Sequence, residues 1–241
     1  MPSGVVMPYW SDRPPGETLE IALNAERFGY REIWMGEMLH FDGFALAGAL
    51  AAQTSNATIT VGPLPVGLRD PVGLAMGIAS IGVLGGRPAR LALGASSPAV
   101  VDGWHGHAWD GNPARMEEAV ALIRSVLRGE RTDHHGVYFR SRGFRSGLGP
   151  QPSHITLAAL GPRALAAADR CADRIVMNLV PSEQVAKVTP SITRPLAVWL
   201  VAGVDPSAEG WRQVRRQIAL YLAAPGYSQV LTAAGLGEVV E

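Results

Sequence analysis

The chain has 241 residues, of which 47% are hydrophobic, and its 21 basic and 21 acidic side chains give a formal net charge of zero. A chain of this length buries one large core, and the neutral balance gives no overall field to attract nucleic acid or an acidic membrane surface. The single cysteine, Cys171, excludes an internal disulfide framework. No signal peptide or membrane-spanning run is recognisable, so we expect a cytoplasmic protein.

Short apolar runs alternate along the chain with longer segments of helical periodicity. Each apolar run is nearly continuous, which is typical of parallel strands covered on both faces. The segments between the runs have apolar positions on one face of a helix. In chain order we expect strand 4–9, helix 16–29, strand 32–36, helix 43–53, strand 57–67, helix 71–85, strand 89–96, helix 113–129, strand 154–161, helix 162–171, strand 173–180, helix 181–189, strand 195–204 and helix 208–223.

This alternation predicts the α/β class with a parallel sheet. An open doubly wound sheet fits the same order, but seven strands in a chain of this length favour a (β/α)8 TIM barrel. The last strand and helix of a complete barrel are not recognisable before Glu241. We therefore expect a single barrel domain, 1–241, with a long insertion at about 129–153 and without the last barrel elements.

In a barrel, the carboxyl ends of the strands carry the chemistry, so the residues after each strand are candidates for a site. Glu37, His40 and Asp42 follow the second strand within six residues. A carboxyl and an imidazole can supply or remove a proton, and histidine titrates close to neutral pH. We expect Glu37 and His40 to be catalytic; alternatively they cap the next helix or pair with each other.

The third strand ends in an unusual backbone at Gly62, Pro63 and Leu64. Proline is not accepted in the interior of a strand, and a cis peptide bond can occur before it. We expect either a rigid bulge that presses against a flat ligand ring or a plain proline-rich exit from the strand.

The fourth strand ends in Gly94, Ala95, Ser96 and Ser97, just before Pro98. Free backbone N–H groups and serine hydroxyls at the start of a helical turn can bind a phosphate. The alternative is ordinary capping by one of the serines, which requires no ligand. No Gly-Lys-Ser/Thr follows, so this segment is not a P-loop.

The later strand ends add Ala159, Gly161 and Asn178. Gly161 precedes Pro162 and allows a helix to begin close to a ligand, whereas the lone amide of Asn178 requires a protein or cofactor partner. His105 and His107 are two residues apart, and no zinc-ligand pattern surrounds them. We therefore expect no metal site.

Several segments together resemble the luciferase-like monooxygenase superfamily and, within it, the coenzyme F420-dependent (deazaflavin) oxidoreductases. The matching segments include "ITVGPLPVGLRDP", "GGRPARLALGASSPAVVDGWHG" and "ITLAALGPRAL". The resemblance implies a barrel that binds F420 or FMN at its C-terminal mouth, often as a homodimer. It places Gly62, Pro63 and Leu64 under the ring, Gly94 to Ser97 at the phosphate, Ala159, Gly161 and Asn178 at the ring or tail, and Glu37 and His40 near the reacting face.

We accordingly expect an oxidoreductase that transfers a hydride between F420 and a small organic substrate. Most of that reactivity belongs to the cofactor, which the protein positions and shields. Three alternatives remain: an FMN-dependent monooxygenase, a non-catalytic flavin-binding barrel, and a phosphate-handling barrel isomerase without a ring cofactor.

Overall fold

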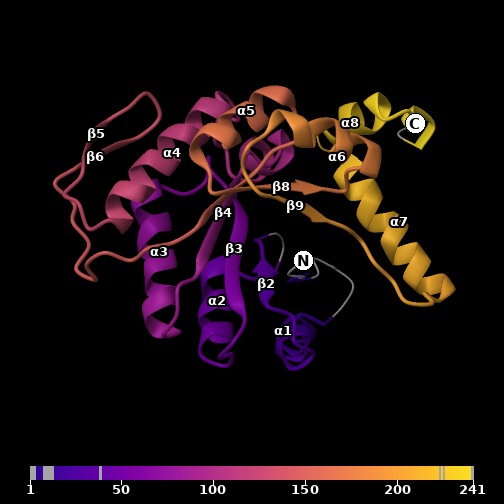
Figure 1. The fold of residues 1–241 in the computed structure, drawn as a ribbon, viewed down its shortest axis with the longest axis horizontal. Coiled ribbons are helices and arrows are strands. Elements are labelled where there is room, and N and C mark those ends of the chain that lie inside the picture. The colour runs from indigo at the N-terminus through magenta and orange to yellow at the C-terminus, as the bar shows by residue number, and fades with distance from the viewer. Residues whose placement is uncertain (1–3, 8–13, 38–39, 223, 225, 240–241) are drawn as a thin grey trace.

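The computed structural model describes residues 4–7, 14–37, 40–222, 224 and 226–239 (Figure 1). Seven strands form one sheet, and every neighbouring pair in it is parallel. Their order in the sheet is also their order in the chain, as expected for a barrel. The strands are β1 (Gly4–Val6), β2 (Glu32–Met35), β3 (Thr58–Pro65), β4 (Arg90–Gly94), β7 (Ile155–Ala158), β8 (Arg174–Asn178) and β9 (Leu196–Trp199).

Helices connect the strands, and each expected helix is present. Figure 1 shows α1 to α3 beside β2 to β4 on one side of the molecule and α7 and α8 at the opposite side. The helices are α1 (Glu17–Arg27), α2 (Gly43–Ala51), α3 (Pro71–Leu84), α4 (Asn112–Leu127), α5 (Pro162–Cys171), α6 (Ser182–Val188), α7 (Ala208–Leu222) and α8 (Tyr227–Ala233), with a π-helix at Ala99–Trp104 and 3-10 turns at Thr189–Ser191 and Gly237–Val239.

The predicted order of elements is therefore confirmed, and most bounds differ by only a few residues. Residues 8 and 9 of the first predicted strand, and residue 223 of the last predicted helix, lie outside the described residues. Helix α8 was not expected. Among the described helices, none has both the length and the apolar character needed to span a membrane.

The sheet curls into a nearly closed barrel of seven strands, in which β1 and β9 are not hydrogen-bonded to each other. Trp34 of β2 and Trp199 of β9 nevertheless meet across the interior, with ring centroids 5.2 Å apart and the rings almost perpendicular. The barrel architecture is thus confirmed, and among the described residues no eighth strand joins this sheet.

Alternate residues of the strands face two different environments. Ile33, Leu91, Leu157 and Ile175 belong to the large buried core between the sheet and the helices. The intervening positions face the barrel interior, where Trp34, Ala92 and Val176 form a second cluster. This alternation follows from the two-residue repeat of a strand.

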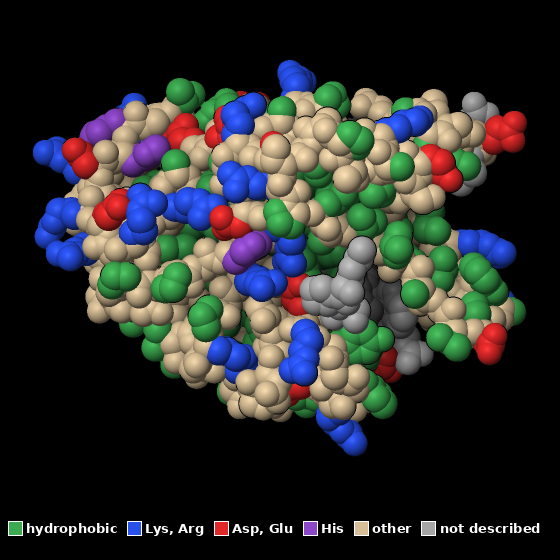
Figure 2. Space-filling view, viewed as in Figure 1, with side chains coloured by type: hydrophobic (Ala, Val, Ile, Leu, Met, Phe, Trp, Pro, Cys, Tyr) green, Lys and Arg blue, Asp and Glu red, His purple; other side chains and the backbone are tan. Residues whose placement is uncertain are grey.

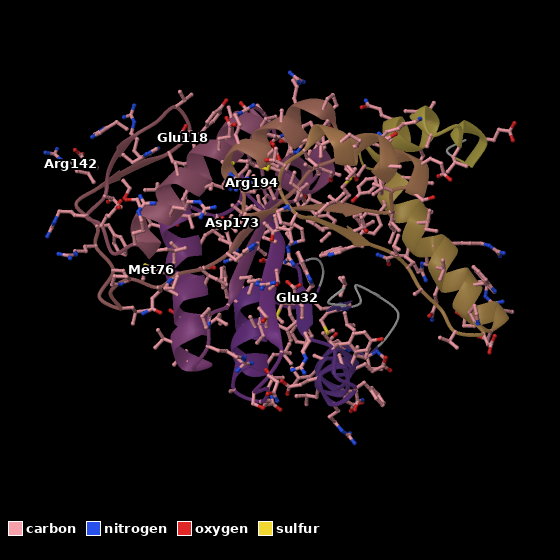
Figure 3. All side chains as sticks on the ribbon, in the orientation of Figure 1. Glu32, Met76, Glu118, Arg142, Asp173 and Arg194 are labelled. Atoms are coloured by element: carbon pink, nitrogen blue, oxygen red, sulfur yellow. The ribbon has the colours of Figure 1, made fainter. Side chains whose placement is uncertain are left out.

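A layer of charged and hydroxyl side chains crosses the barrel interior next to Trp34 and Trp199, on the side towards the amino ends of the strands. Glu32 of this layer lies near the centre of the molecule (Figure 3). The Glu32 carboxylate accepts hydrogen bonds from both terminal nitrogens of Arg174, at 2.6 and 2.9 Å, from Thr60 Oγ1 at 2.6 Å, and from Arg90 at 3.2 Å. Arg174 also donates to Thr156 Oγ1 at 3.2 Å. Burial raises the pKa of Glu32, but the hydrogen bonds from Arg174 and Thr60 outweigh it, so the pKa lies below its ordinary value.

The insertion at about 129–153 contains a short antiparallel hairpin of β5 (Asp133–His135) and β6 (Arg140–Arg142). Its tip is fastened to α4, because the Glu118 carboxylate accepts backbone N–H groups of Val137, Tyr138 and Phe139 at 2.7 to 3.2 Å. Figure 2 shows basic side chains gathered at this edge of the molecule, where Arg140 and Arg142 are exposed. The insertion is thus ordered against a helix.

Arg174→Met should destabilise the fold by about 3 kcal/mol, because it leaves the Glu32 carboxylate poorly compensated in the interior. Urea denaturation followed by circular dichroism measures the change. The double variant Glu32→Gln/Arg174→Met should recover part of the loss, whereas Arg212→Met, in an exposed pair with Glu209, should cost less than about 1 kcal/mol. Equal losses for Arg174→Met and Arg212→Met would contradict a role for the interior layer.

The stability contributed by Glu32 should disappear in acid. Because its folded-state pKa is depressed, this contribution is present above the ordinary glutamate pKa of about 4.3 and is lost as the pH falls through the folded-state value. The unfolding free energies of the wild type and Glu32→Gln should therefore differ at pH 6, and the difference should shrink as the solution is acidified below the ordinary glutamate pKa. A difference that stays constant over this range would refute the assignment.

Candidate functional site

The carboxyl ends of the parallel strands lie at one end of the barrel, here called the mouth. The predicted site residues lie in the last part of β2, β3, β4, β7 and β8 or just after these strands, so the fold brings them towards the same end. Side-chain direction then separates residues that can line the mouth from residues that face the helices.

The expected break in β3 is present. Val61 pairs with Leu91 and Leu64 with Leu93, so the register shifts across Gly62 and Pro63, which are joined by a cis peptide bond. Gly62 has a φ of +116°, and a Cβ on it would lie 2.1 Å from the carbonyl oxygen of Ala92. Only glycine fits there, whereas Leu64 points its fully buried side chain into the outer core.

Small residues line the interior next to this bulge. Ala92 and Ala158 face the barrel interior, and Gly94 continues the same face of β4. A Cβ on Gly94 would be 3.4 Å from the side chains of both Ala158 and Pro63. The side chains at these positions are therefore small, and Gly94 lies in close contact with both neighbours.

The segment after β4 combines an exposed serine with a serine that is hydrogen-bonded within the turn. Ser96 is exposed and has a left-handed φ of +57°, which turns the chain sharply after Ala95. Ser97 Oγ accepts the backbone N–H of Val100 at 3.4 Å, a local bond within the turn; the π-helix that follows has Pro98 at its N-cap and no side-chain capping bond. Trp109 Nε1 donates to the carbonyl oxygen of Ala95 at 2.9 Å and folds the following loop back over the segment.

Glu37 lies in an ion-pair cluster that the sequence did not reveal. Arg69, which follows β3, donates to both carboxylate oxygens of Glu37 at 2.9 and 2.8 Å and also to Asp42. Asp42 caps α2 by accepting the N–H groups of Phe44 and Ala45. Burial raises the pKa of Asp42, but these N–H groups and Arg69 outweigh it and hold the pKa below its ordinary value.

The expected alternative roles for Glu37 and His40 are therefore wrong in detail. Asp42 caps the next helix, and Glu37 pairs with Arg69 rather than with His40. Glu37 is thus bound to a guanidinium, and its catalytic role stays a prediction. His40 is exposed, which leaves its imidazole accessible at the mouth.

The last predicted residues divide between the mouth and the outer core. Asn178 ends β8, and its amide nitrogen donates to the hydroxyl of Tyr227 at 2.9 Å, so its partner is a protein group. Gly161 precedes α5 and has open space around the position of a Cβ. Ala159 is 3% exposed and belongs to the outer core, so only its backbone can line the mouth.

Two further kinds of site were considered among the described residues, a metal-ligand cluster and a reactive thiol. Within the described residues, no three His, Cys, Asp or Glu side chains are grouped so as to hold a metal ion. Burial raises the pKa of Cys171 to about 11, which keeps its thiol protonated at neutral pH. Cys171 is therefore a packing residue.

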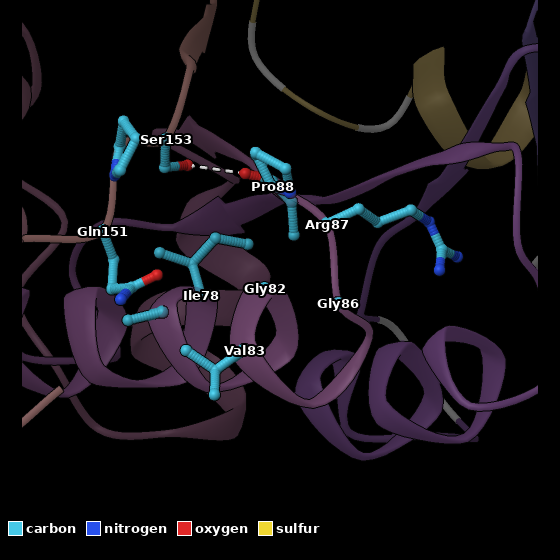
Figure 4. Close-up of a pocket in the computed structure, with 11 residues that line it drawn as sticks. Ile78, Gly82, Val83, Gly86, Arg87, Pro88, Gln151 and Ser153 are labelled. Atoms are coloured by element: carbon cyan, nitrogen blue, oxygen red, sulfur yellow. Dashed lines mark hydrogen bonds between the residues drawn. The ribbon is translucent and has the colours of Figure 1, made fainter.

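A pocket of about 260 Å³ lies near the opposite end of the barrel, before β4 and β7 begin (Figure 4). Ile78, Gly82 and Val83 of α3 line one side, and Gln151 and Ser153 line the other. Ser153 Oγ donates to the Ala89 carbonyl at 2.9 Å, and the Arg87 side chain points away in Figure 4. None of the predicted site residues lines this pocket.

Comparisons with known proteins find similar sequences over most of the chain. A family model described as luciferase-like monooxygenase matches residues 2–232. An F420-dependent glucose-6-phosphate dehydrogenase of Beutenbergia cavernae is 31% identical over 177 residues, covering 67% of this chain and 52% of that protein. The chain spans about half the length of curated relatives such as this one.

Solved structures share the fold at low sequence identity. The coenzyme F420 dependent tetrahydromethanopterin reductase from Methanopyrus kandleri has a TM-score of 0.79 and 16% identity, covering 98% of this chain and 75% of that one. The oxygenating constituent of 3,6-diketocamphane monooxygenase from Pseudomonas putida, solved in complex with FMN, has a TM-score of 0.67 and 16% identity, with coverages of 99% and 78%.

Gly62→Ala should destabilise the protein by at least about 2 kcal/mol, because the added methyl group meets the Ala92 carbonyl and the backbone has a positive φ. Gly147→Ala is the matched control, since Gly147 is exposed, has no positive φ and has nothing within 4 Å of the added atom. It should change stability by less than about 0.5 kcal/mol. Thermal denaturation compares the two variants, and equal midpoints would argue against the bulge geometry.

Proposed function

Because the chain belongs to the luciferase-like monooxygenase family, we propose that it is a coenzyme F420-dependent oxidoreductase acting on a small organic substrate. Curated relatives named as F420-dependent dehydrogenases support this choice. The observation that carries the proposal is the juxtaposition at the mouth of a backbone bulge, a surface of small residues and an exposed serine turn.

The residues at the mouth fit a flat ring with a phosphate on its side chain. Gly62 and Pro63 would provide backbone for one face of the ring, next to the small residues Gly94 and Ala158. Ser96 has a left-handed backbone conformation at the end of β4. In such a turn, successive backbone N–H groups can point to one side and bind an anion. Together with Ala95 and Ser97, it would hold the phosphate without any lysine.

The chemistry that a bound deazaflavin supplies is hydride transfer at its ring. Binding on rigid strand ends orients the ring and the substrate, which lowers the barrier by several kcal/mol in well-oriented systems. The exposed His40 would give or take the accompanying proton. Glu37 and Arg69 would determine the electrostatic potential next to His40. Gly161, Asn178 and the backbones of Leu64 and Ala159 would complete the cofactor contacts.

The choice between F420 and FMN is tested by titrating the purified protein with each cofactor and following fluorescence. We expect binding of F420 and weaker binding of FMN. Binding of FMN alone, with oxygen uptake, would favour the monooxygenase alternative, for which the FMN-bound neighbour is the precedent. Absence of binding by either cofactor would overturn the proposal and leave the isomerase alternative.

Ser96→Asp should weaken F420 binding more than tenfold, because the new carboxylate repels the cofactor phosphate, and aspartate tolerates the left-handed backbone. It should leave the affinity for 8-hydroxy-5-deazariboflavin, which has the ring without the phosphate, nearly unchanged. Ser191→Asp, at an exposed turn before β9, is the matched control. If Ser96→Asp weakens both ligands equally, Ser96 is not at the phosphate.

A homodimer in the cytoplasm is also part of the proposal, and it rests on the family resemblance. Sedimentation equilibrium of the purified chain measures the oligomeric state directly. A monomer at micromolar concentration would remove the dimer without affecting the assignment of the cofactor.

A further inference from the structure

The insertion at 129–153 carries an excess of positive charge, although the whole chain is neutral. It contains four arginines and two carboxylates. Both carboxylates already have partners: Glu130 pairs with Arg128 at 2.6 Å, and Asp133 lies 3.1 Å from the imidazole of His135. None of the four arginines forms an ion pair with a described residue. The insertion therefore offers guanidinium groups that its own carboxylates do not neutralise.

The register of the hairpin separates its two faces. His134 is paired with Ser141, and both side chains point to the body of the protein. The imidazole of His134 contacts the Glu118 carboxylate at 3.1 Å, and Ser141 Oγ donates to Thr132 Oγ1 at 2.8 Å. Because side chains alternate along a strand, the neighbouring positions project from the opposite face. This face, here called the outer face, is exposed and consists of Asp133, His135, Arg140 and Arg142.

Both arginines of the outer face are available to a partner. Arg140 and Arg142 are exposed, and neither has a hydrogen-bond or ion-pair partner among the described residues. Figure 3 labels Arg142 at the left edge of the molecule. Arg131 adds a third charge nearby, because its Nη1 donates to the Gly143 carbonyl at 3.0 Å. A backbone carbonyl has no net charge, so the positive charge of Arg131 is not neutralised there.

The hairpin is held in place from its inner face. Phe139 and Phe144 pack against the large core. The Arg115 guanidinium of α4 lies 4.9 Å from the centroid of the Tyr138 ring, and Glu118 of the same helix accepts the backbone N–H groups of the hairpin tip. The outer arginines thus project from an ordered backbone, which lowers the cost of ordering the surface when a partner binds.

We propose that the outer face of the hairpin is a docking surface for an extended, acidic segment of a partner protein. Arg140 and Arg142 would each pair with a carboxylate of that segment, since the planar guanidinium matches carboxylate geometry. This inference does not depend on the cofactor proposed above, because the surface lies on the insertion and not at the strand ends.

The spacing of the arginines indicates how the partner carries its charge. Arg140 and Arg142 are two positions apart on one face of β6, which places them about 6.5 Å apart along the strand. Alternate side chains of an extended peptide have the same spacing, so a segment with acidic residues at alternate positions matches both arginines. Val137 at the tip is 88% exposed and provides an apolar contact beside them.

An acidic peptide fits this surface better than nucleic acid does. Proteins that bind single-stranded nucleic acid offer aromatic side chains on which the bases stack. Among the described residues of the insertion, the exposed large apolar side chains are Val137 and Leu148, and neither is aromatic. The neutral chain also provides no wider positive field to attract a polyanion.

The probe is a fluorescein-labelled peptide that alternates glutamate and threonine, titrated into the full chain by fluorescence anisotropy. The matched probe has glutamine in place of each glutamate and should bind at least about fivefold more weakly. Arg140→Gln/Arg142→Gln should weaken binding of the glutamate peptide about fivefold to tenfold, as expected for the loss of two exposed ion pairs. Added salt should weaken binding to the wild type, since exposed charges are screened.

Arg31→Gln/Arg215→Gln is the control variant, because it removes two exposed, unpaired arginines at other places in the fold. It changes the net charge by the same amount and should keep the affinity of the wild type within about twofold. Circular dichroism verifies the fold of both double variants.

Three results would overturn the inference. Equal weakening by the two double variants would show an effect of net charge alone. Equal affinity of the two peptides would show that carboxylates are not recognised. Tighter binding of oligothymidylate or of phosphatidylserine vesicles than of the glutamate peptide would assign the surface to another class of partner.

A titration with F420 separates this inference from the proposed function. Arg140→Gln/Arg142→Gln should bind F420 as the wild type does, and a loss of F420 binding in this variant would place the arginines in the cofactor site and overturn the docking surface. If the wild type binds the glutamate peptide as expected but binds no F420, the proposed function fails and the docking surface stands.

Discussion

The ion pair of Glu32 and Arg174 links β2 and β8 through the barrel interior. These residues are 142 positions apart in the chain, and both side chains are only 12 to 13% exposed. A buried carboxylate and a buried guanidinium are costly unless each is paired, so β2 and β8 must approach across the interior. Thr60, Arg90 and Thr156 add contacts from three further strands, which ties the sheet together at one level.

The interior side chains between this layer and the carboxyl ends of the strands determine what the mouth can accept. Trp34 and Trp199 fill the interior directly above, and the Arg174 guanidinium lies 4.6 Å from the Trp34 ring centroid. Towards the mouth, Gly94 and Ala158 replace these large side chains. The middle of the barrel is therefore packed with side chains, so the barrel has no pore through its centre.

The apolar pattern of the sequence predicted the helices and strands well, because secondary structure depends strongly on residues that are close together in the chain. The continuous apolar runs of the strands and the prolines at the first turns of α3 and α5 mark boundaries that tertiary contacts did not move. The hairpin of the insertion was not predicted, since its three-residue strands are polar and carry no apolar alternation. Helix α8 was also missed, although it supplies Tyr227 to the mouth.

The sequence by itself determined the order of strands and helices, the backbone break at Gly62 and Pro63, and the small and hydroxyl residues that follow β4. Each of these depends on the conformational limits of single residues or on short-range periodicity. Tertiary structure alone decided that Glu37 pairs with Arg69, that Asn178 donates to Tyr227, and that Leu64 and Ala159 turn away from the mouth. Hydrogen bonds and ion pairs act over a few ångströms in space, and only the folded chain specifies which distant residues come that close.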